Sequence, residues 1–534
     1  MSIEYKWRSI VEMCRSRAED RGGERALTFL NGDFDDGEAT TYGGLDRDAR
    51  AIATRLSEVT SPGSPVAIAA RPGHGFVAAF LGCLYAGRVA VPLYPPTEKP
   101  LAERFGQIVR HAGIEVALVD GVLPEGADPR LSGINGVRWL NVAEALGAPV
   151  GAWEPPAIDA NAVVMLQYTS GSTGAPKGVA LSNGNLLDNS RLIHQAFGHS
   201  HQSSGVIWLP PYHDMGLIGG IIQPLYGGFP TALASPAAFM RRPLGWLKAI
   251  SKWRATTSGG PNFAYDLCVR RLRDSAGAGL DLDLSCWEVA FCGAEPVRAN
   301  TMREFAEVFK AHGFRAESLF PCYGLAESTL MVSGGPRGAG ATFVSSHASG
   351  DRTSSESVLC GVVMPGCKAM IVEPESRSPA PADVVGELWL SGPSVARGYW
   401  QSNSETEARF GARLLDGSGP FLRTGDLGFM CDGQLCVAGR LTDVLVVHGV
   451  KHHPEDLEFA LQASEPALRK GRTVVCALEA GQGQQIVVIQ ELGKTDIARG
   501  AAFADEIRST VWRTSGLVVE EVVFVPRRAV PFTP

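Results

Sequence analysis

Short apolar runs rich in β-branched residues alternate with longer amphipathic runs in the first part of the chain. The short runs 66–70, 89–93 and 115–120 predict buried strands, and the runs 74–87 and 98–112 between them have the length and spacing of helices. This alternation is typical of βαβ units, in which helices cover a largely parallel sheet. The sequence therefore predicts an α/β fold.

Further strands are expected along the middle of the chain. The apolar runs that predict them are 163–169, 206–210, 289–293, 317–324 and 386–392. Each run leads into glycine, proline or polar residues, and α/β proteins usually bind ligands at such strand ends. Two other stretches, 121–160 and 334–358, are rich in Gly, Pro, Ser and Ala and predict long surface connections.

The pattern changes after residues 428–450, where a compact series of helix and strand candidates begins. We place a domain boundary near Leu441 to Asp443. The chain is thus expected to form a large N-terminal domain of βαβ-built sheets over 1–440 and a small, mobile α+β domain over 441–534, close to the lower size range of domains.

Composition narrows the classes of function. Of the 534 residues, 45% are hydrophobic and 20% are charged, which excludes a disordered or fibrous chain. The 49 basic and 56 acidic residues give a net charge of -7, which argues against a nucleic-acid binder that relies on positive potential. The 11 cysteines are scattered without Cys-x-x-Cys spacing, which favours reduced thiols in the cytoplasm over disulfides or structural zinc.

One stretch, Met215 to Met240, contains no charged residue and is long enough to span a bilayer. Several prolines and glycines within it break a continuous helix, so we expect a buried segment beside a lipophilic pocket and no membrane span. Residues 259–268 follow a strand candidate and are expected to line the same pocket.

The strongest local motif is TSGSTGAPKG, residues 169–178, directly after a strand candidate. Its glycines allow the backbone to approach an anion closely, and Lys177 adds a positive charge. Further donors are the hydroxyls of Thr169, Ser170, Ser172 and Thr173. Such a loop suits a polyphosphate but does not match the P-loop NTPase pattern, and the alternative is a flexible Ser/Gly connection.

With this motif and four others, the chain resembles the adenylate-forming superfamily of acyl-CoA synthetases, nonribosomal adenylation domains, luciferases and fatty acyl-AMP ligases. The other motifs, in the expected order, are GAEPV (293–297), CYGLAES (322–328), FLRTGDLGF (421–429) and GRLTDVLVVHG (439–449). The resemblance spans nearly the whole chain and implies a ligase that uses ATP and Mg²⁺.

The resemblance also implies roles for single residues. The ATP phosphates would be held by Thr169, Ser170, Gly171, Ser172, Thr173, Gly174 and Lys177. The adenine would contact Gly293, Ala294, Glu295, Tyr323 and Gly324. Glu327 would hold Mg²⁺, Asp426 and Arg440 would reach the ribose, and Asp443 matches the hinge of the small domain. Taken singly, these charged residues also suit a helix N-terminus, a turn or a surface ion pair, and the matched order favours the functional interpretation.

Two features resemble the fatty acyl-AMP ligase branch. Ala326 stands in YGLAE where many superfamily members have threonine, and PPYHDMGLIGG (210–220) places His213 and Asp214 near the acyl-adenylate. The resemblance implies that a medium- or long-chain fatty acid is activated to acyl-AMP, with Lys177, His213 and Glu327 as catalytic residues, and is passed to the phosphopantetheine of an acyl carrier protein. A fatty acyl-CoA synthetase and a catalytically impaired binding module remain alternatives, and His213 alone equally suits a hydrogen-bonded core histidine.

The family usually continues past the equivalent of Pro534 with a lysine segment that bridges the substrate carboxylate and the phosphate. The sequence as given ends at residues 530–534. We therefore expect either a piece of a longer protein, with a carrier domain as one continuation, or an impaired homologue.

Overall fold

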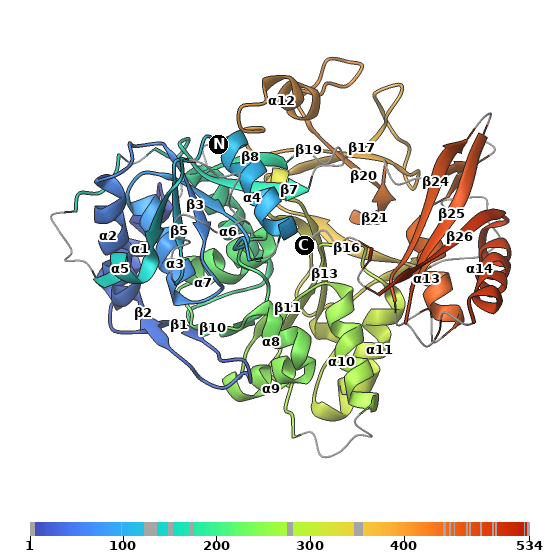
Figure 1. Ribbon diagram of the computed structural model, residues 1–534, viewed down its shortest axis with the longest axis horizontal. Helices are drawn as coiled ribbons and strands as arrows, with labels where there is room; N and C mark the ends of the chain where they lie inside the picture. Colours follow the sequence, from blue (N-terminus) through green and yellow to red (C-terminus); the bar gives the residue numbers. More distant parts are fainter. Residues whose placement is uncertain are drawn as a thin grey trace.

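The computed structural model describes residues 6–97, 99–121, 136–147, 153–157, 159–170, 176–274, 281–345, 356–441, 445–447, 450–452, 454–465, 468, 471–480, 483–493, 496, 499–527 and 529–530. Helices and strands alternate through most of this range, and the predicted α/β class is confirmed (Figure 1).

The first sheet has the predicted βαβ organisation. Its strand order is β6-β5-β3-β4-β7-β8, parallel except for the antiparallel pair of β7 and β8. The strands are β3 (Pro65–Ala69), β4 (Val89–Pro92), β5 (Val116–Val119), β6 (Arg138–Asn141), β7 (Val163–Ser170) and β8 (Pro176–Ser182). The helices beside it are α1 (Ile10–Arg21), α2 (Tyr42–Ser57), α3 (His74–Tyr85), α4 (Lys99–Ala112) and α5 (Val142–Gly147).

Helices cover both faces of this sheet. Val66 and Ile68 of β3 pack into the core that contains helices α1, α2, α3 and α5, whereas Ala67 and Ala69 pack into a second core with Phe105 of α4. Successive side chains of a strand point to opposite faces, so a strand that is buried on both sides must be apolar throughout. This is why the run 66–70 shows no alternation of polar and apolar residues.

The second sheet has more strands, which pair in parallel in one part of the sheet and antiparallel in the other. Its order is β18-β17-β19-β20-β21-β16-β14-β13-β12-β11-β9-β10-β1-β2, with β15 paired to β16. The part with parallel neighbours consists of β1 (Arg25–Phe29), β9 (Gly205–Ile207), β10 (Thr231–Leu233), β11 (Thr257–Gly259), β12 (Val289–Cys292) and β13 (Leu319–Gly324). The antiparallel part consists of β2 (Ala39–Thr41), β14 (Met331–Gly334), β15 (Phe343–Ser345), β16 (Glu356–Val363), β17 (Lys368–Glu373), β18 (Ser378–Pro379), β19 (Gly386–Ser391), β20 (Leu422–Cys431) and β21 (Gln434–Arg440).

The remaining helices of this region connect the strands of the second sheet. They are α6 (Asn183–Ala196), η2 (Met215–Ile222), α7 (Gln223–Gly227), α8 (Pro236–Arg241), α9 (Pro243–Trp253), α10 (Asn262–Asp274), α11 (Ala299–Phe309), η3 (Lys310–His312), η4 (Ala316–Ser318), η5 (Ala326–Ser328) and α12 (Asn403–Phe410). Ser182 and Asn185 form a capping box that starts α6 directly after β8.

Several sequence-based expectations need correction. The connections predicted at 121–160 and 334–358 contain β6, α5 and β15, together with the ends of β14 and β16. The strand expected over 206–210 is shorter, because β9 ends at Ile207, and the expected strand 317–324 begins with the 3₁₀ turn η4. The sheet is also less parallel than predicted, since every pairing from β13 to β18 is antiparallel.

The last elements form sheets of their own, drawn in orange and red in Figure 1. They are β22 (Leu445–Val447), β23 (Val450–His452), α13 (Pro454–Ser464), β24 (Thr473–Ala480), β25 (Gly483–Leu492), α14 (Gly500–Ser515) and β26 (Val519–Pro526). Leu461, Val488 and Ile507 belong to one buried cluster among these elements. The domain boundary near Leu441 to Asp443 stays a prediction.

The uncharged stretch Met215 to Met240 is divided into the short elements η2, α7, β10 and α8. None of the helices in the described part of the chain combines the length and apolar character needed to cross a membrane.

Candidate active site

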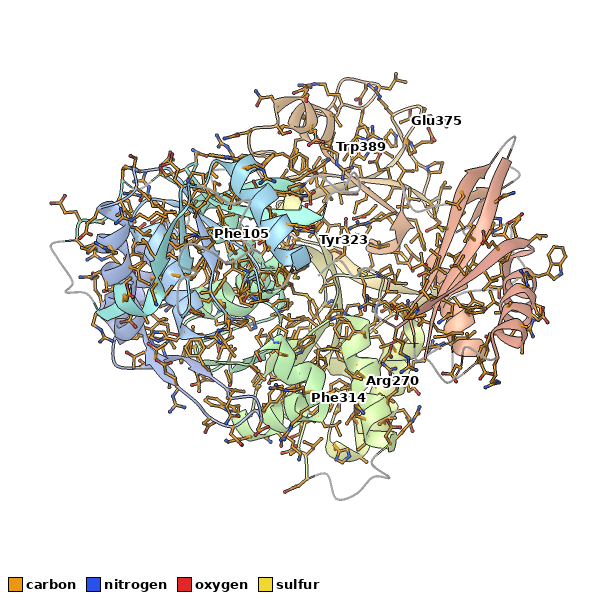
Figure 2. All side chains as sticks on the ribbon, in the orientation of Figure 1. Phe105, Arg270, Phe314, Tyr323, Glu375 and Trp389 are labelled. Carbon is orange, nitrogen blue, oxygen red and sulfur yellow. The ribbon has the colours of Figure 1, made fainter. Side chains whose placement is uncertain are left out.

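A cavity of about 510 Å³ is lined by residues of both sheets. Figure 2 labels Tyr323 near the middle of the molecule and Phe105 on α4 to one side, and both residues line the cavity. The predicted site residues that line it are Thr169, Lys177, His213, Gly293, Ala294, Glu295, Tyr323, Gly324, Glu327, Asp426 and Arg440. Ser170 ends β7, whereas Gly171, Ser172, Thr173, Gly174 and Asp443 lie outside the described residues.

Strands β7 and β8 form the hairpin that carries the phosphate-loop motif. Thr169 lies opposite Lys177 in the register of this pair. The other edge of β8 binds residues 397–400, because Ala180 donates its N–H to the Gly398 carbonyl at 2.9 Å and Trp400 donates to the Gly178 carbonyl at 2.8 Å. This pairing brings Tyr399 beside Lys177.

Lys177 is held between an aromatic ring and a carboxylate. Its Nζ lies 2.9 Å from Oε1 of Glu405 on α12 and 5.4 Å from the ring centroid of Tyr399. The hydrogen bond from Lys177 lowers the pKa of the Glu405 carboxyl. The side chain of Lys177 is 18% exposed and that of Glu405 is 41% exposed, so solvent reaches the carboxylate more easily than the ammonium.

Tyr399 links Glu327 to Arg409. The Tyr399 hydroxyl donates to Oε1 of Glu327 at 2.8 Å, and it also accepts a hydrogen bond from Arg409. Burial, together with the negative charge of Glu327, raises the pKa of Tyr399, so the phenol stays protonated and can donate. Glu327 itself lies on the single turn η5, at the end of the YGLAE motif.

The carboxylate of Asp426 contacts Tyr323 and Arg440, and the residue is almost fully buried. It receives a hydrogen bond of 2.5 Å from the Tyr323 hydroxyl at Oδ2, and its Oδ1 lies 3.3 Å from Nε of Arg440. Strands β20 and β21 place Asp426 directly opposite Arg440. Burial raises the pKa of Asp426, while the Tyr323 hydrogen bond and the Arg440 charge oppose that rise.

Residues 293–295 form a tight turn after β12. A Cβ atom at Gly293 would lie 2.9 Å from the Cys322 carbonyl oxygen, so this position admits no side chain without movement. Ala294 adopts φ 69°, a conformation that costs energy for a residue other than glycine. Glu295 Oε1 accepts the Phe263 N–H at 3.2 Å, at the start of α10. Contacts with Cys322 and Phe263 therefore restrain this turn at the cavity wall.

His213 lies on the turn before η2. Its Nδ1 lies 2.6 Å from Oδ1 of Asp214, and the charge of Asp214 raises the pKa of His213. Gln167 of β7 supports this turn by donating to the Tyr212 carbonyl at 2.7 Å. Gly216 is required here, because a Cβ atom would lie 2.1 Å from the Pro210 carbonyl oxygen.

The rest of the cavity wall is largely apolar. Two groups of side chains form it, one from the second sheet and its helices and one from α4 and the preceding segment. They are Ile193, Phe197, Met215, Phe291, Leu330 and Met331 in the first group and Tyr94, Leu101, Phe105 and Ile108 in the second. Gly219 of η2 also lines the cavity, which agrees with the expected pocket beside Met215 to Met240.

The expectation that residues 259–268 line this pocket is wrong. No residue of that segment is among the described lining residues. Tyr265 is instead buried in the core, where its ring makes an edge contact with Trp246, and its hydroxyl donates to the Phe291 carbonyl at 2.8 Å. The apolar character of a helix start does not distinguish core packing from pocket lining.

Three residues of the site were not predicted: Tyr399, Glu405 and Arg409. They belong to residues 397–410, whose 397–400 segment pairs with β8; Tyr399 and Arg409 line the cavity, and Glu405 contacts Lys177. The Gly398-Tyr399-Trp400 sequence after the strand 386–391 was the one available signal, since a glycine beside two aromatic residues suggests a constrained turn. The structure shows Gly398 at φ 130°.

Comparison with known proteins agrees with the motifs. The model of the family described as AMP-binding enzyme matches residues 14–400. The chain is 36% identical to the medium-chain-fatty-acid acyl-carrier-protein ligase JamA of Moorena producens, over 98% of this chain and 92% of the relative. It is 35% identical to a 4-hydroxyphenylalkanoate adenylyltransferase of Mycobacterium bovis, over 98% of this chain and 89% of the relative.

A solved structure matches nearly the whole chain. The fatty acyl-adenylate ligase of L. pneumophila, crystallised with acyl adenylate and pyrophosphate, superposes with a TM-score of 0.78 at 37% identity and covers 98% of this chain and 94% of its own. With the family model, the relatives and this structure in agreement, the chain belongs to the AMP-binding enzyme family, in its fatty acyl-AMP ligase branch.

Proposed function

We propose that this protein activates a medium- or long-chain fatty acid with ATP to give acyl-AMP and pyrophosphate, and then transfers the acyl group to the phosphopantetheine thiol of an acyl carrier protein. One observation carries the proposal: a single cavity combines polar groups suited to a nucleotide with an apolar wall suited to an alkyl tail. The names of the relatives, a fatty-acid acyl-carrier-protein ligase among them, support the same reaction.

Asp426 is the proposed ribose acceptor. An ionised carboxylate offers about four lone-pair positions, and Tyr323 and Arg440 occupy one on each oxygen. The free positions suit the two neighbouring hydroxyls of a ribose. The rigid turn at Gly293, Ala294 and Glu295, with Tyr323 and Gly324, is the proposed adenine site.

Thr169 to Lys177 are the proposed phosphate ligands, and Glu327 is the proposed Mg²⁺ ligand. Proteins commonly bind Mg²⁺ through one or two carboxylates together with substrate phosphates and water. Glu327 as the one carboxylate ligand therefore fits this ion. Bound there, Mg²⁺ would neutralise negative charge on the phosphates. Tyr399 donates to one oxygen of Glu327 and thereby fixes its orientation.

The proposed first step forms a bond between a carboxylate oxygen of the fatty acid and the α-phosphorus of ATP, and breaks the bond from that phosphorus to the bridging oxygen of pyrophosphate. No general base is needed, because a carboxylic acid with a pKa of about 4 to 5 is already ionised at neutral pH. The main obstacle is repulsion between anions. Lys177 supplies positive charge near the phosphates, and the raised pKa of His213 favours an imidazolium that attracts the carboxylate.

The apolar wall predicts a preference for long chains. Each buried methylene contributes about 0.8 kcal/mol, so four further methylenes raise kcat/KM by about two orders of magnitude while they remain in the cavity. Carboxylate-dependent exchange of pyrophosphate into ATP, measured from acetate to hexadecanoate, tests this. We expect dodecanoate to exceed acetate by at least a thousandfold. A preference for an amino acid or an arylalkanoate would contradict the proposed substrate.

The acceptor is tested separately. We expect acyl transfer from acyl-AMP to a phosphopantetheinylated carrier protein, detected as the mass increase of the carrier, and little transfer to free coenzyme A. Rapid thioester formation with coenzyme A would favour a fatty acyl-CoA synthetase. Nucleotide binding without any turnover would favour an impaired binding module.

We also infer a cytoplasmic location. All 11 cysteines are free, although Cys292 and Cys322 lie close enough for the Cys322 thiol to donate to the Cys292 carbonyl at 3.4 Å. A chain rich in unpaired cysteines suits a reducing compartment.

A further inference from the structure

We propose that Arg409, at the end of α12, binds the α-phosphate of the nucleotide and of the acyl-adenylate. This assignment rests on the proposed function, because it takes the cavity to be a nucleotide site. It adds a ligand for the reacting phosphorus that none of the sequence motifs contains.

Arg409 lines the cavity and is half-buried. It donates to the Thr424 carbonyl at 3.1 Å and to the Tyr399 hydroxyl. Gly425 makes room for it: this residue adopts φ 74°, and a Cβ atom there would lie 3.0 Å from Nη1 of Arg409. The backbone beside Asp426 is thus shaped around the guanidinium.

Arg409 lies between the two ends of the proposed nucleotide site. On one side, Tyr399 connects it to Glu327, the proposed magnesium ligand. On the other side, Thr424 and Gly425 connect it to Asp426, the proposed ribose acceptor. In ATP the α-phosphate is the group that joins the ribose to the remaining phosphates. A cation between Asp426 and Glu327 therefore faces the α-phosphate.

In the described part of the chain, no carboxylate is in direct contact with Arg409. Lys177 and Arg440, which line the cavity together with Arg104, form ion pairs with Glu405 and Asp426 respectively. The hydrogen bonds of Arg409 go to a backbone carbonyl and a phenol, and among the described residues no carboxylate forms an ion pair with it. A guanidinium carries five N–H donors in a planar fork that suits phosphate oxygens.

The cavity wall offers no side-chain hydrogen-bond donor at Ala326. Ala326 lines the cavity beside Glu327, and its methyl group donates no hydrogen bond. A phosphate that carries negative charge in the middle of the cavity needs donors from elsewhere, and Arg409 supplies them.

The test compares the affinities of AMP and adenosine, which share the base and the ribose and differ in the α-phosphate. Calorimetry is performed on the whole chain with wild type, Arg409→Gln and the control Arg413→Gln. Arg413 is an exposed arginine just beyond α12 whose guanidinium donates to the Gly417 carbonyl at 3.1 Å, and it does not line the cavity.

We expect Arg409→Gln to weaken AMP binding by about tenfold to a hundredfold, the effect of losing hydrogen bonds to a charged group, and to change adenosine binding less than twofold. Arg413→Gln should change neither. Arg409→Lys should restore part of the AMP affinity, because it keeps the charge without the planar fork.

Equal losses for AMP and adenosine in Arg409→Gln would show a purely structural role and overturn the assignment. Unchanged AMP binding in this variant, with wild-type AMP binding intact, would overturn it as well. If wild type itself binds AMP no better than adenosine, the proposed nucleotide site fails, and the assignment of Arg409 fails with it. The wild-type titrations with AMP and adenosine alone distinguish this failure from a failure of the Arg409 assignment.

Discussion

Replacing Tyr323 with phenylalanine tests how the proposed ribose site is built. The substitution removes the hydroxyl that donates to Asp426 at 2.5 Å and leaves the ring in place. A hydrogen bond to a charged group contributes about 1.5 to 3 kcal/mol, so we expect kcat/KM for ATP to fall by at least about tenfold. Tyr323 also opposes the rise that burial causes in the pKa of Asp426, so without it that pKa rises further.

This second effect gives the prediction a pH dependence. A carboxyl group with a raised pKa loses its charge as the pH falls, and a protonated Asp426 accepts ribose hydroxyls less well. The deficit of Tyr323→Phe relative to wild type should therefore be larger at pH 6 than at pH 8. The assay is fatty-acid-dependent exchange of pyrophosphate into ATP, measured over a range of ATP concentrations.

Tyr265→Phe is the matched control. Tyr265 is a buried tyrosine whose hydroxyl also donates to an oxygen, the Phe291 carbonyl at 2.8 Å, but it does not line the cavity. Loss of the Tyr265 hydroxyl should leave kcat/KM for ATP unchanged. A wild-type kcat/KM for ATP in Tyr323→Phe at both pH values, or an equal loss in Tyr265→Phe, would contradict the proposed ribose site.

Three further predictions concern other charged groups. Glu405→Gln removes the carboxylate that competes with phosphate for Lys177. Because Glu405 is partly exposed, this ion pair contributes only about 0.2 to 1 kcal/mol, and we expect the KM for ATP to decrease by up to about fivefold. An increase in KM would show instead that Glu405 helps to orient Lys177. Asp214→Asn removes the charge that raises the pKa of His213. The decline of kcat/KM for the fatty acid at alkaline pH should therefore begin at a lower pH than in wild type. An unshifted pH profile would contradict a role for the His213 imidazolium. Burial lowers the pKa of His199 to about 3, so between about pH 6.5 and pH 3 the unfolded chain binds a proton at this residue that the native chain does not. His199 should therefore contribute about 1.4 kcal/mol per pH unit to the fall of the free energy of unfolding in urea on acidification, and the slope should be smaller by that amount in His199→Gln.

The fold was predictable where local pattern decides the structure. The runs 66–70, 89–93 and 115–120 became β3, β4 and β5, because a strand buried on both faces must be apolar along its whole length. The antiparallel half of the second sheet was not predicted. Strands such as β16 and β21 find their partners over long sequence separations, and no local periodicity reports the direction of a partner.

The site residues also fall into those that the sequence predicted and those that it did not. Lys177, Glu327 and Asp426 lie in motifs whose residue types and order carry chemical meaning, and the structure places all three at one cavity. Tyr399 and Arg409 escaped prediction because their positions depend on the pairing of residues 397–400 with the edge of β8. An arginine in the largely polar segment 403–410 looks like a surface residue until tertiary structure is known.

A single-turnover reaction shows whether the cavity joins a nucleotide to a long-chain fatty acid. The chain is mixed with ATP, Mg²⁺ and dodecanoate in the absence of any acceptor, and the products are identified by mass spectrometry. We expect dodecanoyl-AMP and pyrophosphate in amounts close to that of the protein, none without dodecanoate, and a large loss in Asp426→Ala. ADP and phosphate as products, or acyl-AMP formed equally well from acetate, would contradict a cavity that joins a nucleotide to a long alkyl chain.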